Sequence, residues 1–292
     1  MHAIVLAGGS GTRLRELTES ITGRATPKQF CRFGGVSLLQ ETVRRIAPVA
    51  SRGLVVVGPT WAHVARVQMR RHPGFRVLPQ PQDRGTGPGV LLPLARILRR
   101  EPEATVLVTP ADHAVRDGDA FREGILRAER AVRDARAGVV LLAVEAAEPR
   151  TDYGWIVPGA DIGAGLRAVD RFVEKPPADE ATRLHAAGAL WNTMVLVARA
   201  TALRDLFSAA CPDTLRFLEQ AAARPPGERT EWLRRCYHLL GRCDFSRDVL
   251  GPARGAAVHA WPRSLGWADL GTPERLLAWL RDPNPARPPA LS

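Results

Sequence analysis

Apolar runs and helical patterns alternate through the first half of the chain. Short apolar runs predict strands at residues 3–7, 54–57, 76–78, 105–109 and 139–144. Between them, apolar residues at helical spacing predict helices at residues 37–46, 61–71, 90–99 and 120–136. Strands that alternate with helices of this length indicate βαβ units. We therefore predict an α/β, Rossmann-like fold with a mostly parallel central sheet that is flanked by helices.

The pattern changes after about residue 145. Strands are predicted at residues 154–157, 166–173, 195–197 and 256–261, and helices at 178–187, 201–209, 214–222, 230–240 and 273–280. No linker-like stretch separates the two halves. We therefore predict a single domain over residues 1–281, in which a smaller lobe (about 146–281) is built onto the first half (about 1–145). The tail, residues 282–292, is rich in proline, and we expect it to be frayed.

The composition is that of an ordinary globular protein and excludes global disorder. The chain has 292 residues, of which 45% are hydrophobic and 24% are charged, as in typical folded domains. No apolar run approaches the roughly 20 residues of a membrane span, and residues 1–6 lack the charged start of a secretory signal. Four cysteines without C-x-x-C spacing favour buried or idle thiols over zinc or a redox pair. We therefore expect a cytoplasmic protein without a membrane partner.

The net charge is +11, and the sequence pI is about 10.8. Nucleic-acid binding is one interpretation of this charge. The arginines, however, are scattered over predicted amphipathic helices, and no recognition motif is present, so a solvated arginine-rich surface is favoured. Only two of the 41 cationic side chains are lysines, Lys28 and Lys175. Because a lysine is a compact point charge and an arginine is a planar fork, the two exceptions suggest phosphate chemistry.

A glycine-rich loop, Gly8-Gly9-Ser10-Gly11-Thr12-Arg13, follows the first predicted strand directly. Such a loop lets backbone N–H groups approach a phosphate chain. It is neither a dinucleotide fingerprint nor a Walker A loop, because residue 14 is leucine and no Gly-Lys-Ser/Thr follows. Arg13 is a candidate phosphate clamp, and Lys28, after the rigid Pro27, is a second. The alternatives are a plain glycine turn and an exposed loop lysine.

Two aspartates are candidate metal ligands. Asp112 follows the strand at 105–109, at the edge where parallel sheets place ligands. Asp269 precedes Thr272 and Pro273, which are typical of a helix N-cap and first turn. Asp269 is not needed for that cap and is therefore available as a second carboxylate. Mg²⁺ prefers one or two carboxylates together with substrate phosphates. His113 is more often only a neighbour in such a motif.

A third group in the second half has the composition of a sugar pocket. Tyr153-Gly154, Glu174-Lys175 and Trp191-Asn192 combine acids, an amide, a lysine and aromatic rings. Sugar hydroxyls need carboxylate and amide partners, and a sugar face packs on aromatic rings. Taken singly, the aromatic residues are more often part of a core.

In combination, these motifs resemble the sugar-1-phosphate nucleotidyltransferases. The resemblance runs from about residue 3 to residue 280 and rests on segments that occur in one order, among them 6–14, 27–30, 37–40, 110–113, 173–176 and 267–271. Within that family, the segments are most similar to mannose-1-phosphate guanylyltransferases. Both lysines fall inside the motifs. The stretch 84–88 and the pair Thr193-Met194 differ from the pattern that is usual in guanylyltransferases.

The resemblance implies an enzyme that converts an NTP and a sugar 1-phosphate into an NDP-sugar and pyrophosphate with Mg²⁺. GTP and mannose 1-phosphate are the expected substrates, and a homo-oligomer is compatible with the family. The alternatives are a different base or sugar, or a catalytically silent relative that senses a nucleotide-sugar. The resemblance assigns the residues as follows. Arg13, Lys28 and Asp112 are catalytic; Leu6, Ala7, Gly8, Gly9, Gly11, Thr12, Gln80 and Gly85 bind the nucleotide; Tyr153, Gly154, Glu174, Lys175 and Asn192 bind the sugar phosphate; Asp112 and Asp269 hold the metal.

Overall fold

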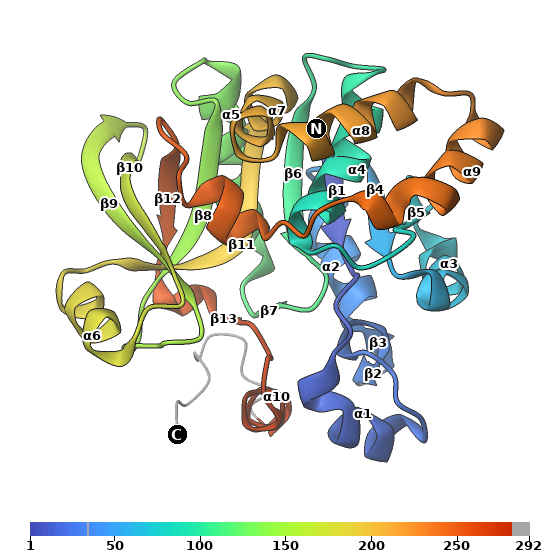
Figure 1. Ribbon diagram of the computed structural model, residues 1–292. Coiled ribbons are helices and arrows are strands. Elements are labelled where there is room, and N and C mark those ends of the chain that lie inside the picture. The colour runs from blue at the N-terminus through green and yellow to red at the C-terminus, as the bar shows by residue number, and fades with distance from the viewer. Residues whose placement is uncertain (34, 282–292) are drawn as a thin grey trace.

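A nine-stranded sheet forms the centre of the molecule (Figure 1). The computed structural model describes residues 1–33 and 35–281, so the predicted tail lies outside the described residues. The strand order is β5-β4-β1-β6-β11-β8-β12-β10-β9. The strands are β1 (His2–Leu6), β4 (Arg52–Val57), β5 (Phe75–Pro79), β6 (Thr105–Pro110), β8 (Val139–Glu145), β9 (Gly154–Gly163), β10 (Leu166–Glu174), β11 (Leu190–Arg199) and β12 (Ala257–Trp261).

The sheet is mixed, which corrects the prediction of a mostly parallel sheet. β5, β4, β1 and β6 form parallel pairs, as the alternation of strands and helices predicts. β11, however, enters between β6 and β8 and is antiparallel to both. β10 is antiparallel to β12 and β9. Strands of the second half therefore interleave with those of the first, and a single sheet runs through both predicted halves.

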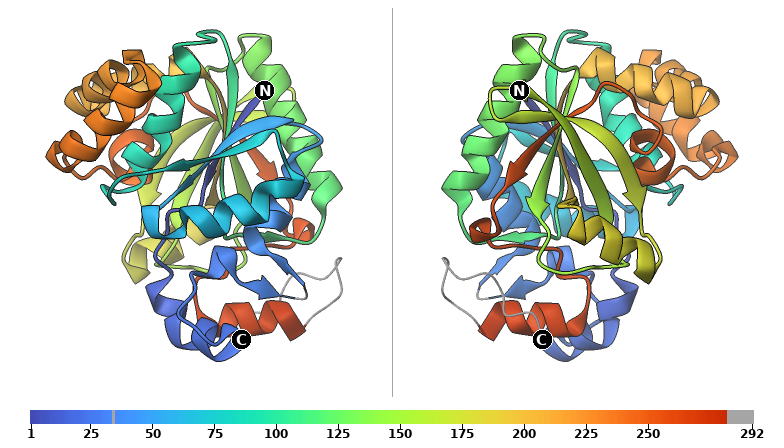
Figure 2. Two further views of the ribbon diagram at one scale, coloured as in Figure 1. Left: turned by 90° about the vertical axis from the view of Figure 1, so that its right-hand side faces the viewer. Right: turned by 90° about the vertical axis from the view of Figure 1, so that its left-hand side faces the viewer.

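Helices cover both faces of the sheet, and the alternation along β1 shows why. Ala3 and Val5 face one core cluster, whereas Ile4 between them faces the other, because successive side chains of a strand point to opposite faces. The first cluster packs under α2 (Leu38–Ile46), α3 (Ala62–Gln68) and α5 (Gly118–Arg133). The second packs under α4 (Thr86–Leu98), α7 (Ala200–Ala210), α8 (Pro212–Ala223) and α9 (Pro226–Cys236). Figure 2 shows both layers from the side.

Several predicted boundaries differ from those found, and both the helix Arg15–Thr22 and the π-helix Phe245–Leu250 were not predicted. β9 extends to Gly163 and β11 begins at Leu190. The far end of β9 is exposed, so no apolar run marked it. α6 (Ala178–Ala186) was predicted almost as found. The helix α1 (Arg15–Thr22) was missed, because it buries only Thr18 and shows no apolar stripe. The helix predicted at 230–240 begins earlier, at Pro226, and ends at Cys236.

A small subdomain lies beyond the carboxyl ends of β1 and β6. It contains α1, the two-stranded pairs β2 (Arg32–Phe33) with β3 (Val36–Ser37) and β7 (Ala114–Val115) with β13 (Trp267–Ala268), and α10 (Pro273–Arg281). α1 and α10 lie side by side at the bottom of Figure 1. Leu14, Leu270 and Leu276 bury one another there. Within residues 1–33 and 35–281, no helix is long and apolar enough to cross a membrane.

Candidate functional site

Lys28 is buried where three predicted motifs meet. Its side chain is 9% exposed, and Nζ donates to the backbone carbonyls of Asp269 (2.6 Å) and Leu270 (3.0 Å). The same Nζ lies 3.2 Å from Asp112 Oδ2. An ammonium group has three N–H donors, so each of them has a protein acceptor in this arrangement. The structure thus brings Lys28, Asp112 and the Asp269 segment together, although residues 28 and 269 are far apart in the sequence.

The glycine-rich loop is held against the Lys28 segment by a residue that the sequence did not single out. The buried amide of Gln29 donates to the carbonyls of Ala7 (2.9 Å) and Gly9 (2.8 Å). Gly11 packs against the backbone of Pro27 in the same segment. Its backbone is in the left-handed region (φ 63°), and a Cβ there would lie only 3.2 Å from Pro27 Cα, so a glycine is favoured at this position. Gly8 and Gly9 remain exposed. The loop backbone is therefore fixed beside Lys28 and open to solvent.

Arg275 is a second residue that the sequence did not single out. Its guanidinium joins Asp269 Oδ1 (2.8 Å) to Asp152 Oδ2 (2.6 Å) and lies 4.8 Å from the centre of the Tyr153 ring. Burial raises the pKa of the Asp269 carboxyl, but His113, Arg275 and Lys28 outweigh burial and hold the pKa below its ordinary value. Asp269 is therefore a fixed, ionised carboxylate.

The donor set at Lys28 fits a hard divalent cation. Asp112 and Asp269 are two carboxylates near one ammonium group, and both contribute to the electrostatics of the buried His113. Mg²⁺ usually takes one or two carboxylates and completes its shell with water and substrate phosphate. Among the described residues, no group of three or more acidic, histidine or cysteine side chains could hold a metal. Two carboxylates are thus compatible with the ligand number that Mg²⁺ takes from protein, and the metal itself stays a prediction.

The predicted sugar residues form one contiguous cluster. A Cβ on Gly154 would lie 2.6 Å from Glu174 Oε2 and 3.4 Å from Asn192 Cβ, so only glycine allows this approach. Lys175 Nζ lies 3.3 Å from Glu174 Oε1, and its backbone N–H donates to the Tyr153 carbonyl. Burial raises the pKa of the Glu174 carboxyl, and Lys175 opposes this shift.

Aromatic rings connect the sugar cluster to the Asp269 segment. Tyr153 packs edge-on against Trp191 and Trp267, with ring centroids 4.9 and 5.6 Å apart. Tyr153 and Trp191 are thus core-like, as the alternative interpretation held, and they also hold the cluster in place. The indole N–H groups of Trp191 and Trp267 are buried without a hydrogen-bond partner. A bound ligand with acceptor atoms could satisfy such groups.

Gln80, one of the two residues predicted for the base side, lies beside the glycine loop. Gly8 and Gly89 both face Gln80, and a Cβ on either would lie within 4 Å of Gln80 Oε1. Burial raises the pKa of the Tyr237 hydroxyl, and a side-chain hydrogen bond with Gln80 opposes this shift, so the two buried groups are neighbours. Buried polar groups are nearly always paired in native structures. Tyr237 thus provides a polar neighbour for the Gln80 amide beside the glycine loop.

The segment at 84–88 is shaped by Cys243. The N–H of Gly87 donates to the Cys243 carbonyl, and the N–H of Cys243 donates to the Arg84 carbonyl. A Cβ on Gly85 (φ 93°) would lie 2.4 Å from the Cys243 carbonyl oxygen. Cys243 Sγ also lies 3.6 Å from Cys211 Sγ, a pairing that sequence spacing could not indicate. The segment that differs from the usual guanylyltransferase pattern is thus held in place by Cys243.

Backbone strain is concentrated at the site. Among the described residues, five that are not glycine have a positive φ, and three of these are Lys175 (50°), Met194 (58°) and Leu270 (43°). Met194 lies at a bulge in β11, just after Asn192. Each such conformation costs about 1–3 kcal/mol and persists where surrounding contacts enforce it, often at functional sites.

The remaining predicted residues are placed as follows. Leu6 ends β1, and Thr12 and Arg13 are exposed on the turn after the glycine loop. No hydrogen bond or ion pair of the Arg13 side chain is found within the described part of the chain, so its phosphate role stays a prediction. Burial lowers the pKa of His113, Asp112 and Asp269 oppose this shift, and the ring packs edge-on against Trp267. Thr272 Oγ1 accepts from Arg275 N (3.4 Å), as the cap prediction held.

The site combines a glycine loop after β1, a buried lysine, two aspartates and a neighbouring cluster of carboxylate and aromatic side chains. On an α/β fold, these features are typical of proteins that bind phosphorylated substrates. Residues 2–282 match the model of the nucleotidyl transferase family. The chain therefore belongs to that family, and within it to the sugar-1-phosphate nucleotidyltransferases that the motifs resemble.

Similar proteins support this assignment. Xanthan biosynthesis protein XanB of Xanthomonas campestris pv. campestris is 34% identical over 282 residues, and the match covers 94% of this chain and 58% of XanB. Mannose-1-phosphate guanylyltransferase of Escherichia coli K12 is 29% identical, with 93% and 58% covered. The chain thus spans less than two thirds of the length of these relatives. The crystal structure of a Thermus thermophilus protein named mannose-1-phosphate geranyltransferase superposes with a TM-score of 0.82 at 30% identity, covering 98% of this chain and 80% of that one.

Proposed function

We propose that this protein transfers a nucleotidyl group from an NTP to a sugar 1-phosphate, releasing pyrophosphate. The observation that carries the proposal is the convergence on Lys28 of the glycine loop, Asp112 and the Asp269 segment. Two polyanions must meet in this reaction, so cations are needed to offset their repulsion and align the attack. GTP and mannose 1-phosphate are the proposed substrates, because relatives of this chain carry that name.

The chain supplies positioning and charge rather than a nucleophile. The sugar phosphate oxygen attacks the α-phosphorus in line, and positive charge stabilises the leaving pyrophosphate. Backbone N–H groups of residues 8–12 would receive the NTP phosphates. Lys28 can donate to a phosphate oxygen when that oxygen replaces one of its three protein acceptors. Arg13, exposed on the next turn, would add a second cation.

Asp112 and Asp269 would hold Mg²⁺, which supplies charge neutralisation on the phosphates when bound. Arg275 and Gly271 N–H fix Asp269, so its second oxygen keeps a constant direction. Glu174, Asn192 and Gly154 would face the sugar hydroxyls, with Lys175 at the sugar phosphate. Gln80 and Gly85 would contact the base. The cytoplasmic location and the absence of nucleic-acid partners stay predictions, as does a homo-oligomeric state.

Pyrophosphate release measured with Mg²⁺, for four NTPs crossed with a panel of sugar 1-phosphates, tests the proposal. Release with GTP and mannose 1-phosphate alone supports it in full. Release with another pair retains nucleotidyl transfer and refutes the substrates. If folded protein binds a nucleotide-sugar and releases no pyrophosphate with any pair, the sensing alternative replaces the enzyme.

Asp112→Asn tests the proposed site itself. The variant keeps the shape of the side chain, and Lys28 keeps its two carbonyl acceptors, so the protein should fold and lose Mg²⁺-dependent turnover. Asp213→Asn is the matched control, since the Asp213 side chain is 93% exposed on α8. Equal turnover of the two variants would show that Asp112 is not a metal ligand.

A further inference from the structure

A cavity of about 740 Å³ lies far from the proposed active site. It opens at the amino ends of the central strands, at His2 of β1, Arg52 of β4 and Arg76 of β5. The glycine loop leaves the opposite end of β1. At roughly 3.3 Å per residue, the four steps from His2 to Leu6 separate the two places by more than about 13 Å. The cavity is therefore a separate feature of the molecule.

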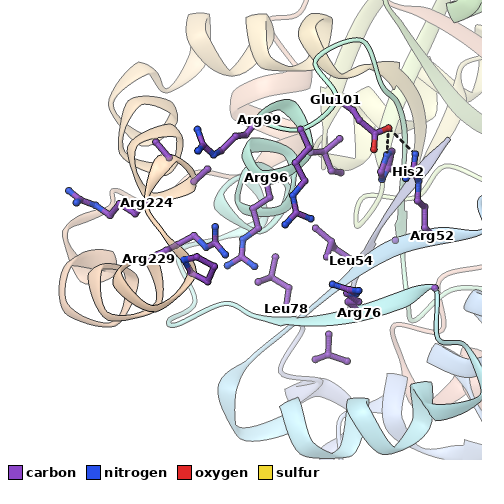
Figure 3. Close-up of a pocket in the computed structure, with 18 of the residues that line it drawn as sticks. His2, Arg52, Leu54, Arg76, Leu78, Arg96, Arg99, Glu101, Arg224 and Arg229 are labelled. Atoms are coloured by element: carbon purple, nitrogen blue, oxygen red, sulfur yellow. Dashed lines mark hydrogen bonds and ion pairs between the residues drawn. The ribbon is translucent and has the colours of Figure 1, made fainter.

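The cavity is lined by arginines from four distant parts of the sequence. Seven arginines and one glutamate lie on its walls: Arg52 and Arg76 on strands, Arg96, Arg99 and Arg100 at the end of α4, and Arg224 and Arg229 around the start of α9. Glu101 is already occupied, because it accepts from Arg52 (2.8 Å) and pairs with His2 (2.9 Å). Figure 3 shows these partners together at one side of the cavity.

The central arginines have no counter-charge. In Figure 3 the Arg96 and Arg229 side chains point toward one another, and the Nε atoms of both are buried without a hydrogen-bond partner. Within the described residues, no ion pair is found for Arg76, Arg96, Arg99, Arg100 or Arg229. Burial lowers the pKa of Arg96 to about 10, and repulsion from Arg229 and Arg100 adds to this shift. Like charges gathered in this way destabilise a protein unless an anion offsets them.

The floor of the cavity is apolar. Leu54, Leu78 and Ile97 form this apolar floor, and Pro73 and Pro225 also line the cavity. Pockets of roughly 300–1,000 Å³ with an apolar floor and a few converging polar groups are typical of small-molecule sites. Guanidinium forks match phosphate oxygens and also stack on planar rings. The occupant should therefore combine several phosphate groups with an apolar or aromatic part.

We propose that this arginine-lined cavity is a second ligand site, which binds a small organic polyphosphate of the nucleoside di- or triphosphate class. The occupant places its phosphates between Arg96, Arg229 and Arg100 and its organic part on the apolar floor. α4 links this site to the proposed active site, since its first turn carries Gly87 and its last turn carries Arg96.

Isothermal titration with inorganic tripolyphosphate and with ADP, in the absence of Mg²⁺, tests the site. We expect Arg96→Leu/Arg229→Leu to weaken tripolyphosphate binding at least tenfold, while the active-site variant Lys28→Met and the exposed control Arg216→Leu retain it. Pyrophosphate release by Arg96→Leu/Arg229→Leu should equal that of the natural chain, because neither residue belongs to the proposed catalytic machinery. ADP should bind more tightly per phosphate than the inorganic chain, because only ADP can use the apolar floor.

Thermal unfolding separates a ligand site from a purely structural role. Without ligand, Arg96→Leu should raise Tm by a few degrees, because it removes a repelled charge; with tripolyphosphate, the natural chain should gain more than the variant. A lowered Tm for Arg96→Leu without ligand would mean that the arginine stabilises the fold, and would overturn the proposal.

The milder pair Arg76→Gln/Arg100→Gln, at exposed positions, provides a second test if the double leucine variant does not fold. Weaker binding supports the proposal, and unchanged binding overturns it. A loss of tripolyphosphate binding in Lys28→Met instead would locate the anion at the active site, because Lys28 is the phosphate donor proposed there. Displacement by duplex DNA at a lower concentration than by ADP would identify a nucleic-acid surface and would also overturn the proposal.

Discussion

Removing the Arg275 guanidinium should expose how the proposed metal site is built. In Arg275→Met, the carboxylates of Asp269 and Asp152 lose hydrogen bonds of 2.8 and 2.6 Å. The Arg275 side chain is 13% exposed, and those of Asp269 and Asp152 are 22% and 34% exposed. Asp152 can therefore recover water, whereas Asp269 cannot recover it fully. The perturbation thus falls mainly on the predicted metal ligand.

The expected loss of stability follows from that burial. Breaking a fully buried ion pair by removing one partner costs about 3–5 kcal/mol, and the partial exposure of Asp152 lowers our expectation to about 2–3 kcal/mol. For a domain of this size, such a loss lowers Tm by roughly 4–12 °C. Arg275→Lys should lie between, because a lysine cannot bridge both carboxylates as a fork does. Arg281→Met, exposed on the same helix, is the matched control.

Arg275→Met should also weaken the binding of Mg²⁺ at the proposed active site. Loss of a residue that orients a metal ligand typically weakens metal affinity about 10- to 100-fold. The rate of pyrophosphate release, measured against Mg²⁺ concentration, should therefore reach half its maximum at a roughly 10- to 100-fold higher concentration in Arg275→Met. A lower half-saturating concentration would show that Arg275 competes with the metal for Asp269. Either that result or an unchanged curve would refute the reasoning.

The pH dependence of the same variant provides an independent check. The pKa of Asp269 is held below its ordinary value of 3.8. A carboxylate with a lowered pKa stabilises the folded state above its unfolded-state pKa, and this contribution is lost as the pH falls through the folded-state pKa. The difference in unfolding free energy between the natural chain and Arg275→Met should therefore be complete at neutral pH and shrink below about pH 4.

Three further predictions concern the base and sugar sides. Gly87→Ala places a Cβ 2.5 Å from Cys243 Sγ, so it should lower the unfolding free energy by about 1–3 kcal/mol and raise KM for the NTP. Adding Cys243→Ala to this variant should partly restore both quantities. If neither is restored, the clash with the Cys243 side chain is not the cause. Lys175→Arg should reduce kcat/KM for the sugar phosphate by more than Arg171→Lys does, because a planar fork replaces a point charge. Equal effects of the two variants would contradict the interpretation that the rare lysines mark phosphate contacts. Burial raises the pKa of Glu174, so KM for the sugar phosphate should begin to rise on acidification at a higher pH than expected for an exposed glutamate. Glu174→Gln should abolish this acidic rise in KM. If the rise is retained in the variant, another group causes it.

Much of the proposed site could be predicted from local sequence. The glycine loop directly after an apolar strand, the aspartate after the strand at 105–110, and the scarcity of lysine each have a local cause in backbone freedom, strand ends and side-chain chemistry. Tertiary structure confirms that Lys28 and Asp112 meet and that Gly154, Glu174 and Asn192 form one cluster. Their roles in substrate binding stay predictions.

Gln29 and Arg275 show what local sequence could not indicate. Gln29 was visible only as a neighbour of Lys28, and its amide gains a role when the chain brings the carbonyls of Ala7 and Gly9 to 2.9 and 2.8 Å from it. Arg275 is one of many arginines at helical spacing, and nothing in its own segment distinguishes it from the others. Its function depends on Asp152, which is 123 residues away.

By itself, the sequence determined which segments become strands in the first half, since burial on both faces requires continuous apolar runs there. It also determined the chemical class of the site, because motif residues act through short-range geometry. Only the tertiary structure decided that β11 enters antiparallel between β6 and β8, and that arginines from residues 52 to 229 share one cavity. The order of the strands and the clustering of the arginines depend on contacts between residues far apart in the chain. The hydrophobic periodicity and the motif spacing of the sequence do not predict such contacts.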